Sequence, residues 1–360
     1  MRAAVLHEIE DAKIEVRDDV AVVGPRAGEV LIKVRAAGVC HSDLSVRNGG
    51  LPQPMPVILG HEAAGEILAV GEAVTGLAPG DHVIASWQPP CGTCAVCLHG
   101  QPHLCFTHAI NAFITPRFVV GGTPAFGMMG CGAFAEQMVV PQQGAVKIAD
   151  DVPFDLAALV GCSVMTGVGA VINTAKVRPG STVVVIGCGG VGISVIQGAR
   201  ASGASTIVAV DTNAAKQETA RQFGATHGVH PDGLAELLGP LTLGEGFDYA
   251  FEAVGSSQTT KMAWGATRRG GHTVIVGAGG VDEDVELSLF ELLHDGKTLT
   301  GSLYGEANIR TDFHRLLSLW RAGRLDLEGM ITHRIGLDDI NEALTALGRG
   351  EVIRQVIIHD

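Results

Sequence analysis

The pattern of hydrophobic and polar positions changes near Asp155. Before this residue, short apolar runs separated by Gly and Pro turns predict β-strands at 30–36, 65–71 and 80–86. After it, an apolar helical stretch leads into β-branched runs that alternate with helical segments. We expect strands at 181–186, 206–210, 247–253 and 272–276, and helices at 191–202 and 213–223. Strands that alternate with helices predict an α/β fold with a doubly wound parallel sheet.

The chain after about residue 303 returns to a mixed pattern, with a predicted helix at 313–321 and a final strand at 352–358. We therefore predict a Rossmann domain at 163–302 that is inserted into a mostly β domain. The N-terminal part of that β domain, 1–162, includes a cysteine-rich lobe at 88–106. Its C-terminal part, 303–360, is expected to come together with the N-terminal part.

Composition and charge narrow the classes of partner. The 360 residues carry 25 Lys and Arg against 38 Asp and Glu, a formal net charge of −13. This balance disfavours nucleic acid or an anionic membrane as a partner, because both bind basic surfaces. Acids at Glu8, Glu10 and Asp11 interrupt the apolar core that a signal peptide needs. The uncharged stretches 156–175 and 179–199 reach membrane-spanning length, but glycines and hydroxyls interrupt them. We expect buried core there, and a cytoplasmic protein.

A glycine turn follows the predicted strand 181–186 and opens the next helix. In this GxGxxG pattern, Gly187 would allow a tight turn, Gly189 would let the backbone approach a pyrophosphate, and Gly192 would let helix and strand pack closely. Asp211 ends the next strand, 24 residues after Gly187, where a carboxylate can bind ribose hydroxyls. A purely structural turn is the alternative, but strand, turn, helix and terminal acid all favour dinucleotide binding. Because Asp211 would repel a 2′-phosphate, we expect NAD rather than NADP.

Four cysteines fall within fifteen residues, at Cys91, Cys94, Cys97 and Cys105. Four thiolates in one compact loop favour a tetrahedral structural zinc site without an open position. Free or paired thiols are the alternative, which the regular spacing disfavours. A nucleic-acid zinc ribbon is disfavoured because the flanking residues lack a basic cluster.

A second set of metal-ligating residues is dispersed along the chain. Cys40, His61 and Cys162 come from three separate segments, and two cysteines with one histidine are typical of a catalytic zinc with an open fourth position. Taken singly, a cysteine can be a small buried hydrophobe and a histidine an ordinary loop residue. The sequence alone leaves both readings open, because it does not show that distant residues meet.

Taken together, these motifs resemble the zinc-containing medium-chain alcohol dehydrogenases along essentially the whole chain. The Gly60-His61-Glu62 signature, Cys40 with the Ser42-Asp43 pair, the four lobe cysteines and the glycine turn carry the resemblance. It implies a GroES-like catalytic domain, a catalytic and a structural zinc ion, and reversible hydride transfer between an alcohol and NAD. The 56 residues between Cys105 and Cys162 are similar to the longer, liver-type branch, which implies a homodimer. We expect its edge at 270–285.

The resemblance also implies roles at the catalytic metal. Cys40, His61 and Cys162 would bind it, and Glu62 would be the acidic residue beside it that can exchange into its coordination sphere. Asp43 would orient the imidazole of His61, a role with a physical basis in N–H donation to a carboxylate.

Proton transfer and cofactor binding follow from the same resemblance. Ser42 would take the alcohol proton, and Ser45 stands where many liver-type members have the histidine that ends the relay. The last proton step would then use His41 or water. The implied cofactor-binding residues are His41, Gly187, Gly189, Gly190, Val191, Gly192, Asp211, Lys216, Val276 and Arg354.

The substrate-facing positions that the resemblance implies are apolar. They are Leu51, Trp87, Ile110, Met128, Met129 and Leu303. These residues favour primary alcohols with medium-length or aromatic tails, and their aldehydes. Members specialised for glutathione–formaldehyde adducts carry acids in the loop before Gly-His-Glu, and 47–59 contains none.

Other functions stay open at this point. A formaldehyde, thiol-adduct or polyol dehydrogenase of the same family is one alternative, and a non-catalytic protein that senses NAD and zinc is another. A zinc-free quinone reductase relative is disfavoured, because such proteins lack both the lobe and the Gly-His-Glu signature.

Overall fold

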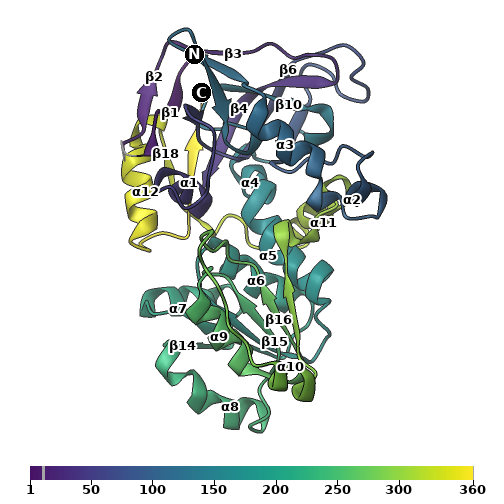
Figure 1. Ribbon diagram of the computed structural model, residues 1–360, viewed down its shortest axis with the longest axis vertical. Helices are drawn as coiled ribbons and strands as arrows, with labels where there is room; N and C mark the ends of the chain where they lie inside the picture. The colour runs from purple at the N-terminus through teal and green to yellow at the C-terminus, as the bar shows by residue number, and fades with distance from the viewer. Residues whose placement is uncertain (10–12, 360) are drawn as a thin grey trace. The chain divides into compact units, whose positions relative to one another are not determined.

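Two compact units make up the chain in the computed structural model, which describes residues 1–9 and 13–359. The first unit comprises Met1–Ser163, Asn308–Leu317 and Leu327–Asp360, and the second comprises Val164–Ala307 and Ser318–Asp326. Glu10 and Asp11, used above against a signal peptide, lie outside the described residues. The insertion of an α/β unit into a mostly β unit is therefore confirmed (Figure 1).

The first unit contains two sheets. One has the order β2(Glu15–Arg17)-β1(Ala3–Leu6)-β5(Val57–Ile58)-β9(Thr123–Gly127)-β8(Phe118–Val120)-β3(Val20–Val22). The other has the order β11(Ala145–Lys147)-β7(His82–Ala85)-β6(Glu62–Val70)-β4(Glu29–Val39)-β19(Arg354–Ile358)-β18(Ile331–Ile335), with β10(Gln137–Pro141) also paired to β4. Alternate residues of β4 are buried along its first half, as a strand with one face on the core requires.

The C-terminal strand closes this unit. β19 pairs antiparallel with β4, with Gln355 opposite Val39, so the N- and C-terminal parts of the β domain come together as predicted (Figure 1). β6 begins at Glu62, three residues before the predicted strand, which places the acid of the Gly-His-Glu signature at the first position of a strand. The helices of the unit are α1(His41–Arg47), α2(Ala95–Leu98), α3(Phe106–Ile114), α4(Phe154–Leu159) and α12(Ile340–Gly348).

The second unit is built on a parallel sheet. Its order is β14(His227–Val229)-β13(Thr206–Val210)-β12(Thr182–Ile186)-β15(Phe247–Glu252)-β16(Thr267–Ile275)-β17(Thr298–Gly301), and each neighbouring pair is parallel. The strand order reverses at β12: β13 and β14 follow on one side of it, and β15, β16 and β17 on the other. This arrangement is typical of a dinucleotide-binding sheet. Helix α6 packs against β12 and β13, and α9 against β15 and β16 (Figure 1). The predicted doubly wound sheet is confirmed.

The helices of this unit are α5(Met165–Gly169), α6(Gly190–Ala201), α7(Ala214–Gln222), α8(Leu234–Thr242), α9(Ser257–Ala266) and α10(Leu289–Asp295). Helix α11(Ile309–Arg321) begins four residues before the predicted helix and contributes to both units. β16 begins at Thr267 instead of His272, because its pairing with β15 shifts register near Tyr249 and resumes at His272. Glycines at 270 and 271 interrupt the apolar pattern, so the sequence did not predict the first part of this strand.

The apolar stretch after Asp155 is a helical run. Phe154–Ala175 is long and apolar enough to cross a membrane, and 89% of its most apolar window is buried inside the structure. It is therefore a core helix, as its interrupted composition predicts. Val160–Val164 forms a π-helical turn in it, a feature often found at functional sites.

Candidate active site

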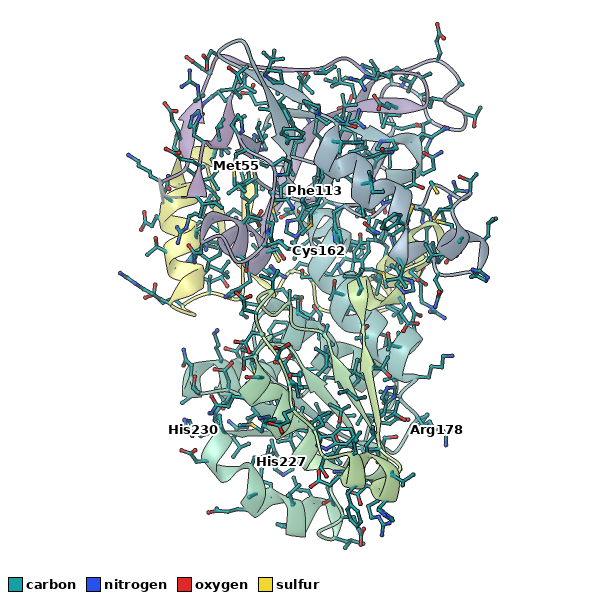
Figure 2. The ribbon with its side chains drawn as sticks, in the orientation of Figure 1. Met55, Phe113, Cys162, Arg178, His227 and His230 are labelled. Atoms are coloured by element: carbon teal, nitrogen blue, oxygen red, sulfur yellow. The ribbon has the colours of Figure 1, made fainter. Side chains whose placement is uncertain are left out.

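Four chemically active side chains meet inside the first unit. Cys40 follows β4, His61 precedes β6, and Glu62 opens β6. Cys162, labelled in Figure 2, lies in the π-helical turn. All four are buried, and their ligand atoms lie within 4.8 Å of one another. The fold thus brings together the three ligands predicted from distant segments, with Glu62 beside them.

A glycine makes room for the carboxylate of Glu62. Gly38 on β4 pairs with Glu62 on β6. A Cβ at Gly38 would lie 2.2 Å from Glu62 Oε2, so any side chain there would displace the acid. The sequence contains this glycine but nothing that reveals its cross-strand partner.

Asp43 holds the two segments that carry Cys40 and His61. Its carboxylate accepts hydrogen bonds from the Cys40 N–H at 2.9 Å and from the Gly60 N–H at 2.9 Å. His61 Nδ1 lies 3.5 Å from Asp43 Oδ1, and both side chains are fully buried. With Asp43 on the Nδ1 side, Nε2 remains for a ligand, which is the arrangement expected beside a metal-binding histidine.

Arg354 is placed differently from the expectation. Its side chain is buried, with Nη2 3.5 Å from Glu62 Oε1 and Nη1 donating to the Val39 carbonyl at 3.1 Å. The resemblance implies that Arg354 binds a cofactor phosphate, and it gave no indication of this ion pair with Glu62. The residues lie 292 positions apart, and only the pairing of β19 with β4 joins them.

The electrostatics of the cluster favour a metal cation. The Cys162 thiol lowers the pKa of Cys40 well below its usual range, and the adjacent Cys40 raises the pKa of Cys162. Burial raises the pKa of Glu62 to about 7, against the opposing charge of Arg354. A cation bound among these groups would favour the ionised forms of the thiols and of the carboxyl.

The donor set fits zinc. Two thiols and an imidazole suit a borderline-soft ion with a tetrahedral preference, and such a set would leave a fourth position for substrate or for the adjacent Glu62. In the described part of the chain, both ring nitrogens of His61 and both carboxylate oxygens of Glu62 are buried without a hydrogen-bond partner. Such buried polar atoms are costly unless a ligand satisfies them.

The four-cysteine lobe forms a second ligand group. The sulfurs of Cys91, Cys94, Cys97 and Cys105 lie within 4.8 Å of one another. Backbone N–H groups of Thr93 and Cys94 donate to Cys91 Sγ at 3.4 and 3.3 Å, and the Cys91 N–H donates to Cys105 Sγ at 3.2 Å. Amide donors around thiolates offset their negative charge. The set of four sulfurs agrees with the predicted structural zinc site.

Two further predicted residues border the buried cluster. Ser42, in α1, has its Oγ 3.9 Å from Cys40 Sγ. The ring of Trp87 stands edge-on to the His61 ring, with 6.5 Å between centroids. His41, the first residue of α1, is exposed.

The expected substrate-facing residues separate into different environments. Leu51, Trp87 and Met129 are half-buried against the core of the first unit, and Ile110 is exposed on α3. Leu303 is exposed in the second unit. Met128 is completely buried in the core, so the expectation that it faces substrate is corrected. Its apolar neighbours in the sequence gave no signal to distinguish core from pocket.

The glycine turn has the geometry that the sequence predicts. Gly187 has φ +92° and its N–H donates to the Val210 carbonyl. A Cβ at Gly192 would lie 1.8 Å from the Gly187 carbonyl oxygen, whereas a Cβ at Gly189 would meet nothing within 4 Å. Gly192 therefore serves close packing, and open space lies beside Gly189 for a ligand.

Asp211 directly follows β13, beside this turn. Its carboxylate accepts hydrogen bonds from the Cys188 N–H and the Asn213 N–H, each at 2.9 Å. Lys216 is half-buried on α7, and Val276 directly follows β16. Glu252, which sequence reasoning missed, is fully buried and accepts hydrogen bonds from the Val254 and Gly255 N–H groups.

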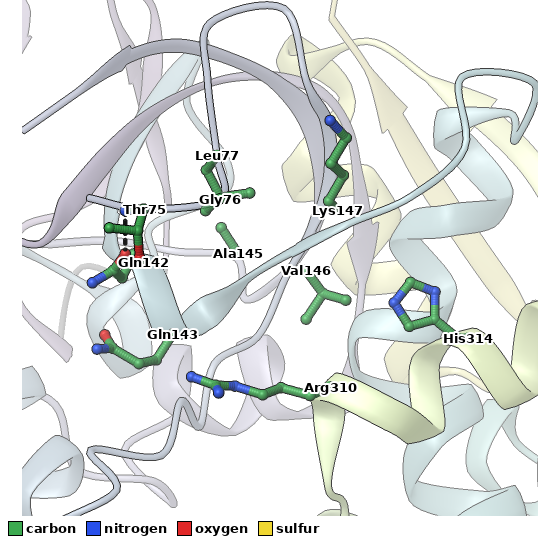
Figure 3. Close-up of a pocket in the computed structure, with 10 residues that line it drawn as sticks. All are labelled: Thr75, Gly76, Leu77, Gln142, Gln143, Ala145, Val146, Lys147, Arg310 and His314. Atoms are coloured by element: carbon green, nitrogen blue, oxygen red, sulfur yellow. Dashed lines mark hydrogen bonds between the residues drawn. The ribbon is translucent and has the colours of Figure 1, made fainter.

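A cavity of about 400 Å³ lies elsewhere in the first unit (Figure 3). It is lined by Thr75, Gly76, Leu77, Gln142, Gln143, Ala145, Val146, Lys147, Arg310 and His314. Gln142 Oε1 accepts a hydrogen bond from the Thr75 N–H, and Lys147 pairs with Asp81. None of the lining residues belongs to either cysteine cluster, and their polar character differs from the apolar site that the sequence predicts.

Comparison with known proteins covers both units. Residues 26–150 match the family model of the alcohol dehydrogenase GroES-like domain, and residues 190–321 match the model of zinc-binding dehydrogenases. An S-(hydroxymethyl)glutathione dehydrogenase of Paracoccus denitrificans is 38% identical over 360 residues, covering 95% of each chain.

Solved structures agree with this similarity. A benzyl alcohol dehydrogenase of Acinetobacter calcoaceticus is 32% identical, with a TM-score of 0.91 over 100% of this chain and 99% of its own. An alcohol dehydrogenase zinc-binding domain protein of Burkholderia ambifaria is 31% identical, with a TM-score of 0.94 over 100% of this chain and 98% of its own.

Proposed function

The chain belongs to the zinc-containing medium-chain alcohol dehydrogenase family, and we propose that it transfers hydride reversibly between a primary alcohol and NAD, giving the aldehyde. The observation that carries this proposal is the buried group of Cys40, His61 and Cys162 with Glu62 beside it. A protein that only senses the dinucleotide has no need of a metal position with an open coordination site.

Each residue of the site has a physical task in this reaction. Bound zinc would supply Lewis-acid polarisation of the substrate oxygen, and bound NAD would supply the hydride acceptor. Cys40, Cys162 and His61 would hold the metal, and Asp43 keeps the imidazole oriented. Ser42, with its hydroxyl beside Cys40, would accept the proton of the alcohol and pass it on to His41 or water.

The glycine turn and Asp211 support NAD as the cofactor. The N-terminus of α6 offers backbone N–H groups to a pyrophosphate, and open space at Gly189 admits its approach. Lys216 and Val276 would contribute to the same dinucleotide site. The carboxylate of Asp211 would accept ribose hydroxyls and repel a 2′-phosphate.

Replacing Asp211 tests the cofactor assignment. Asp211→Asn keeps an oxygen that can accept the Cys188 or Asn213 N–H, but it removes the charge that favours ribose hydroxyls. We expect the Kd for NAD to rise by about ten- to hundredfold, since a hydrogen bond to a charged group contributes about 1.5–3 kcal/mol. The Kd for NADP should change by less than about threefold, because its repulsion is lost as well.

Fluorescence titration with NADH and NADPH measures both constants. Asp232→Asn, at an exposed carboxylate, is the matched control and should leave both unchanged. If Asp211→Asn weakened the affinity for both cofactors equally, the assignment of Asp211 to the ribose would be wrong.

Two observations bear on the substrate. The aromatic ring of Trp87 beside His61 favours an apolar or aromatic tail next to the metal site. The similarity to S-(hydroxymethyl)glutathione dehydrogenases favours a second candidate, the hydroxymethyl adduct of a thiol. Residues 47–59 carry no acid that would bind the ammonium group of a glutathione moiety, so we put the apolar primary alcohol first.

The test combines metal analysis with turnover. We expect two zinc ions per chain, one for each ligand group, and NADH formation with benzyl alcohol and medium-chain primary alcohols. Faster turnover of S-hydroxymethylglutathione than of every simple alcohol would favour the second candidate. A single zinc ion without turnover of either substrate would instead support the sensor function.

We also propose a homodimer in the cytoplasm, where the cysteines stay reduced. Helix α10 exposes a group of large apolar side chains, with Phe290 70% and Leu293 77% exposed, and Val281 and Val285 before it are exposed too. β17 lies at the end of the parallel sheet. An exposed apolar group and an open sheet edge are each typical of an interface between copies of a chain.

Replacing Leu293 tests this interface. Wild-type protein is expected to sediment at twice the monomer mass of 37.3 kDa. Leu293→Asp should sediment as a monomer at micromolar concentration, because it places a charge within the apolar surface. Leu243→Asp, at a 92% exposed position on the loop after α8, is the control and should remain a dimer. A dimeric Leu293→Asp variant would contradict this location.

A further inference from the structure

Met129 has a backbone conformation that a bulky residue adopts only when its surroundings impose it. Its φ is +52° and its ψ is +28°, in the left-handed region. This conformation costs about 1 kcal/mol or more for a residue with a side chain. Hydrogen bonds fix both sides of the residue: the Met129 N–H donates to Gln53 Oε1 at 3.0 Å, and the Met129 carbonyl lies 3.3 Å from His108 Nε2.

His108 joins this turn to a second segment. Its Nε2 also lies 3.0 Å from the Trp87 carbonyl. Because both neighbours are carbonyl oxygens, Nε2 carries the proton and donates to both. The imidazole is buried, and Gly130 leaves room for it, since a Cβ there would lie 3.2 Å from His108 Cε1.

One of the two segments held by His108 adjoins the metal cluster. The Trp87 ring stands edge-on to His61, one of the proposed metal ligands. Met129 is half-buried and packs against the same core as Trp87. The His108 imidazole therefore holds the backbone of Trp87, whose ring lies beside the metal cluster, and the strained backbone of Met129.

The lobe positions His108 itself. Cys105 directly precedes the first residue of α3, and its carbonyl accepts a hydrogen bond from the Ala109 N–H at 3.3 Å. The helix that carries the imidazole is thus attached at its start to the four-cysteine group. This path connects the lobe to the residues beside the catalytic cluster through covalent structure and named hydrogen bonds.

We propose that His108 is a positioning residue that sets Trp87 and Met129 as two walls of an apolar substrate site, so that the lobe governs selectivity for bulky alcohols. The proposal deepens the proposed function and rests on it. Small alcohols would need only the metal ligands and Ser42, whereas a bulky tail would need both walls in place. Since productive geometry is sensitive to shifts of about 1 Å, losing the imidazole would affect bulky substrates selectively.

Three variants test the proposal. His108→Leu removes the donor but keeps an apolar side chain in the buried position. His108→Gln keeps an N–H near the place of Nε2, and Asn111→Ala changes an exposed residue of the same helix. The readouts are kcat and KM for benzyl alcohol and ethanol, the urea midpoint, and amide exchange of the segment around Met129.

We expect His108→Leu to raise KM for benzyl alcohol by about tenfold, as the loss of one or two buried hydrogen bonds would, while kcat for ethanol changes less than about twofold. Exchange of the Met129 amide should accelerate by about tenfold, because the turn opens more often. In His108→Gln, KM for benzyl alcohol and exchange of the Met129 amide should both return most of the way to the wild-type values. In Asn111→Ala, neither should change.

The outcomes separate the two proposals. A wild-type protein that oxidises no primary alcohol would refute the proposed function, and the selectivity proposal would fall with it. With wild-type turnover present, equal losses for ethanol and benzyl alcohol, or unchanged exchange at Met129 in His108→Leu, would overturn the positioning role alone. A matching fall in the urea midpoint without selective loss would show that His108 serves stability only.

Discussion

Replacing Cys162 with alanine is expected to lower kcat/KM for a primary alcohol by at least about a thousandfold, since a catalytic metal contributes several kcal/mol of transition-state stabilisation. The variant loses one of two sulfur ligands in a buried group whose remaining donors are Cys40, His61 and Glu62. It should therefore retain close to one zinc ion per chain, held by the lobe. Elemental analysis and initial rates of NADH formation measure both effects.

Cys131→Ala is the matched control for that variant. Cys131 is equally buried, and burial raises its pKa to about 12, so it is a neutral thiol in the core. The control should keep two zinc ions and close to wild-type turnover. If Cys162→Ala also kept two ions and full activity, the metal would have to lie elsewhere, and the buried group would be a cluster of ordinary core thiols.

Local patterns predicted the fold well. The strand predicted at 206–210 matches β13(Thr206–Val210). A β-branched run bounded by polar residues predicts both ends of a strand. The start of β16 was missed, since two adjacent glycines interrupt its apolar pattern and only pairing with β15 continues the strand. The start of α11 was missed because Arg310 and Thr311 gave no apolar periodicity before Phe313.

The site divides in the same way. Spacing alone predicted the lobe, because its four cysteines lie close together in the chain. The catalytic group could be predicted only from the resemblance to a known family. Cys162 lies 101 residues after His61, and nothing in the sequence links the two positions. Three contacts had no signal in the sequence: Arg354 with Glu62, Gly38 beside Glu62, and His108 with Met129. Each joins residues through strand pairing or a turn whose conformation depends on tertiary structure.

Gly192→Ala should have the largest effect on the dinucleotide-binding unit. The new Cβ would lie 1.8 Å from the Gly187 carbonyl oxygen and 2.9 Å from its carbon, so α6 would have to move away from the turn after β12. Because backbone atoms cannot give way as a flexible side chain does, we expect a loss of about 3 kcal/mol in the free energy of unfolding. NAD binding should fall below detection in fluorescence titration, since the pyrophosphate loses the helix N-terminus.

Gly189→Ala separates packing from ligand approach within the same turn. Its Cβ would meet nothing within 4 Å, and φ of −77° is open to alanine, so the urea midpoint should stay within error of the wild type. The Kd for NAD should nevertheless rise by about tenfold or more, because the methyl group would occupy the space expected for the pyrophosphate. Normal NAD affinity in Gly189→Ala would place the phosphates elsewhere. Normal stability in Gly192→Ala would show that helix and strand can separate at this point without cost.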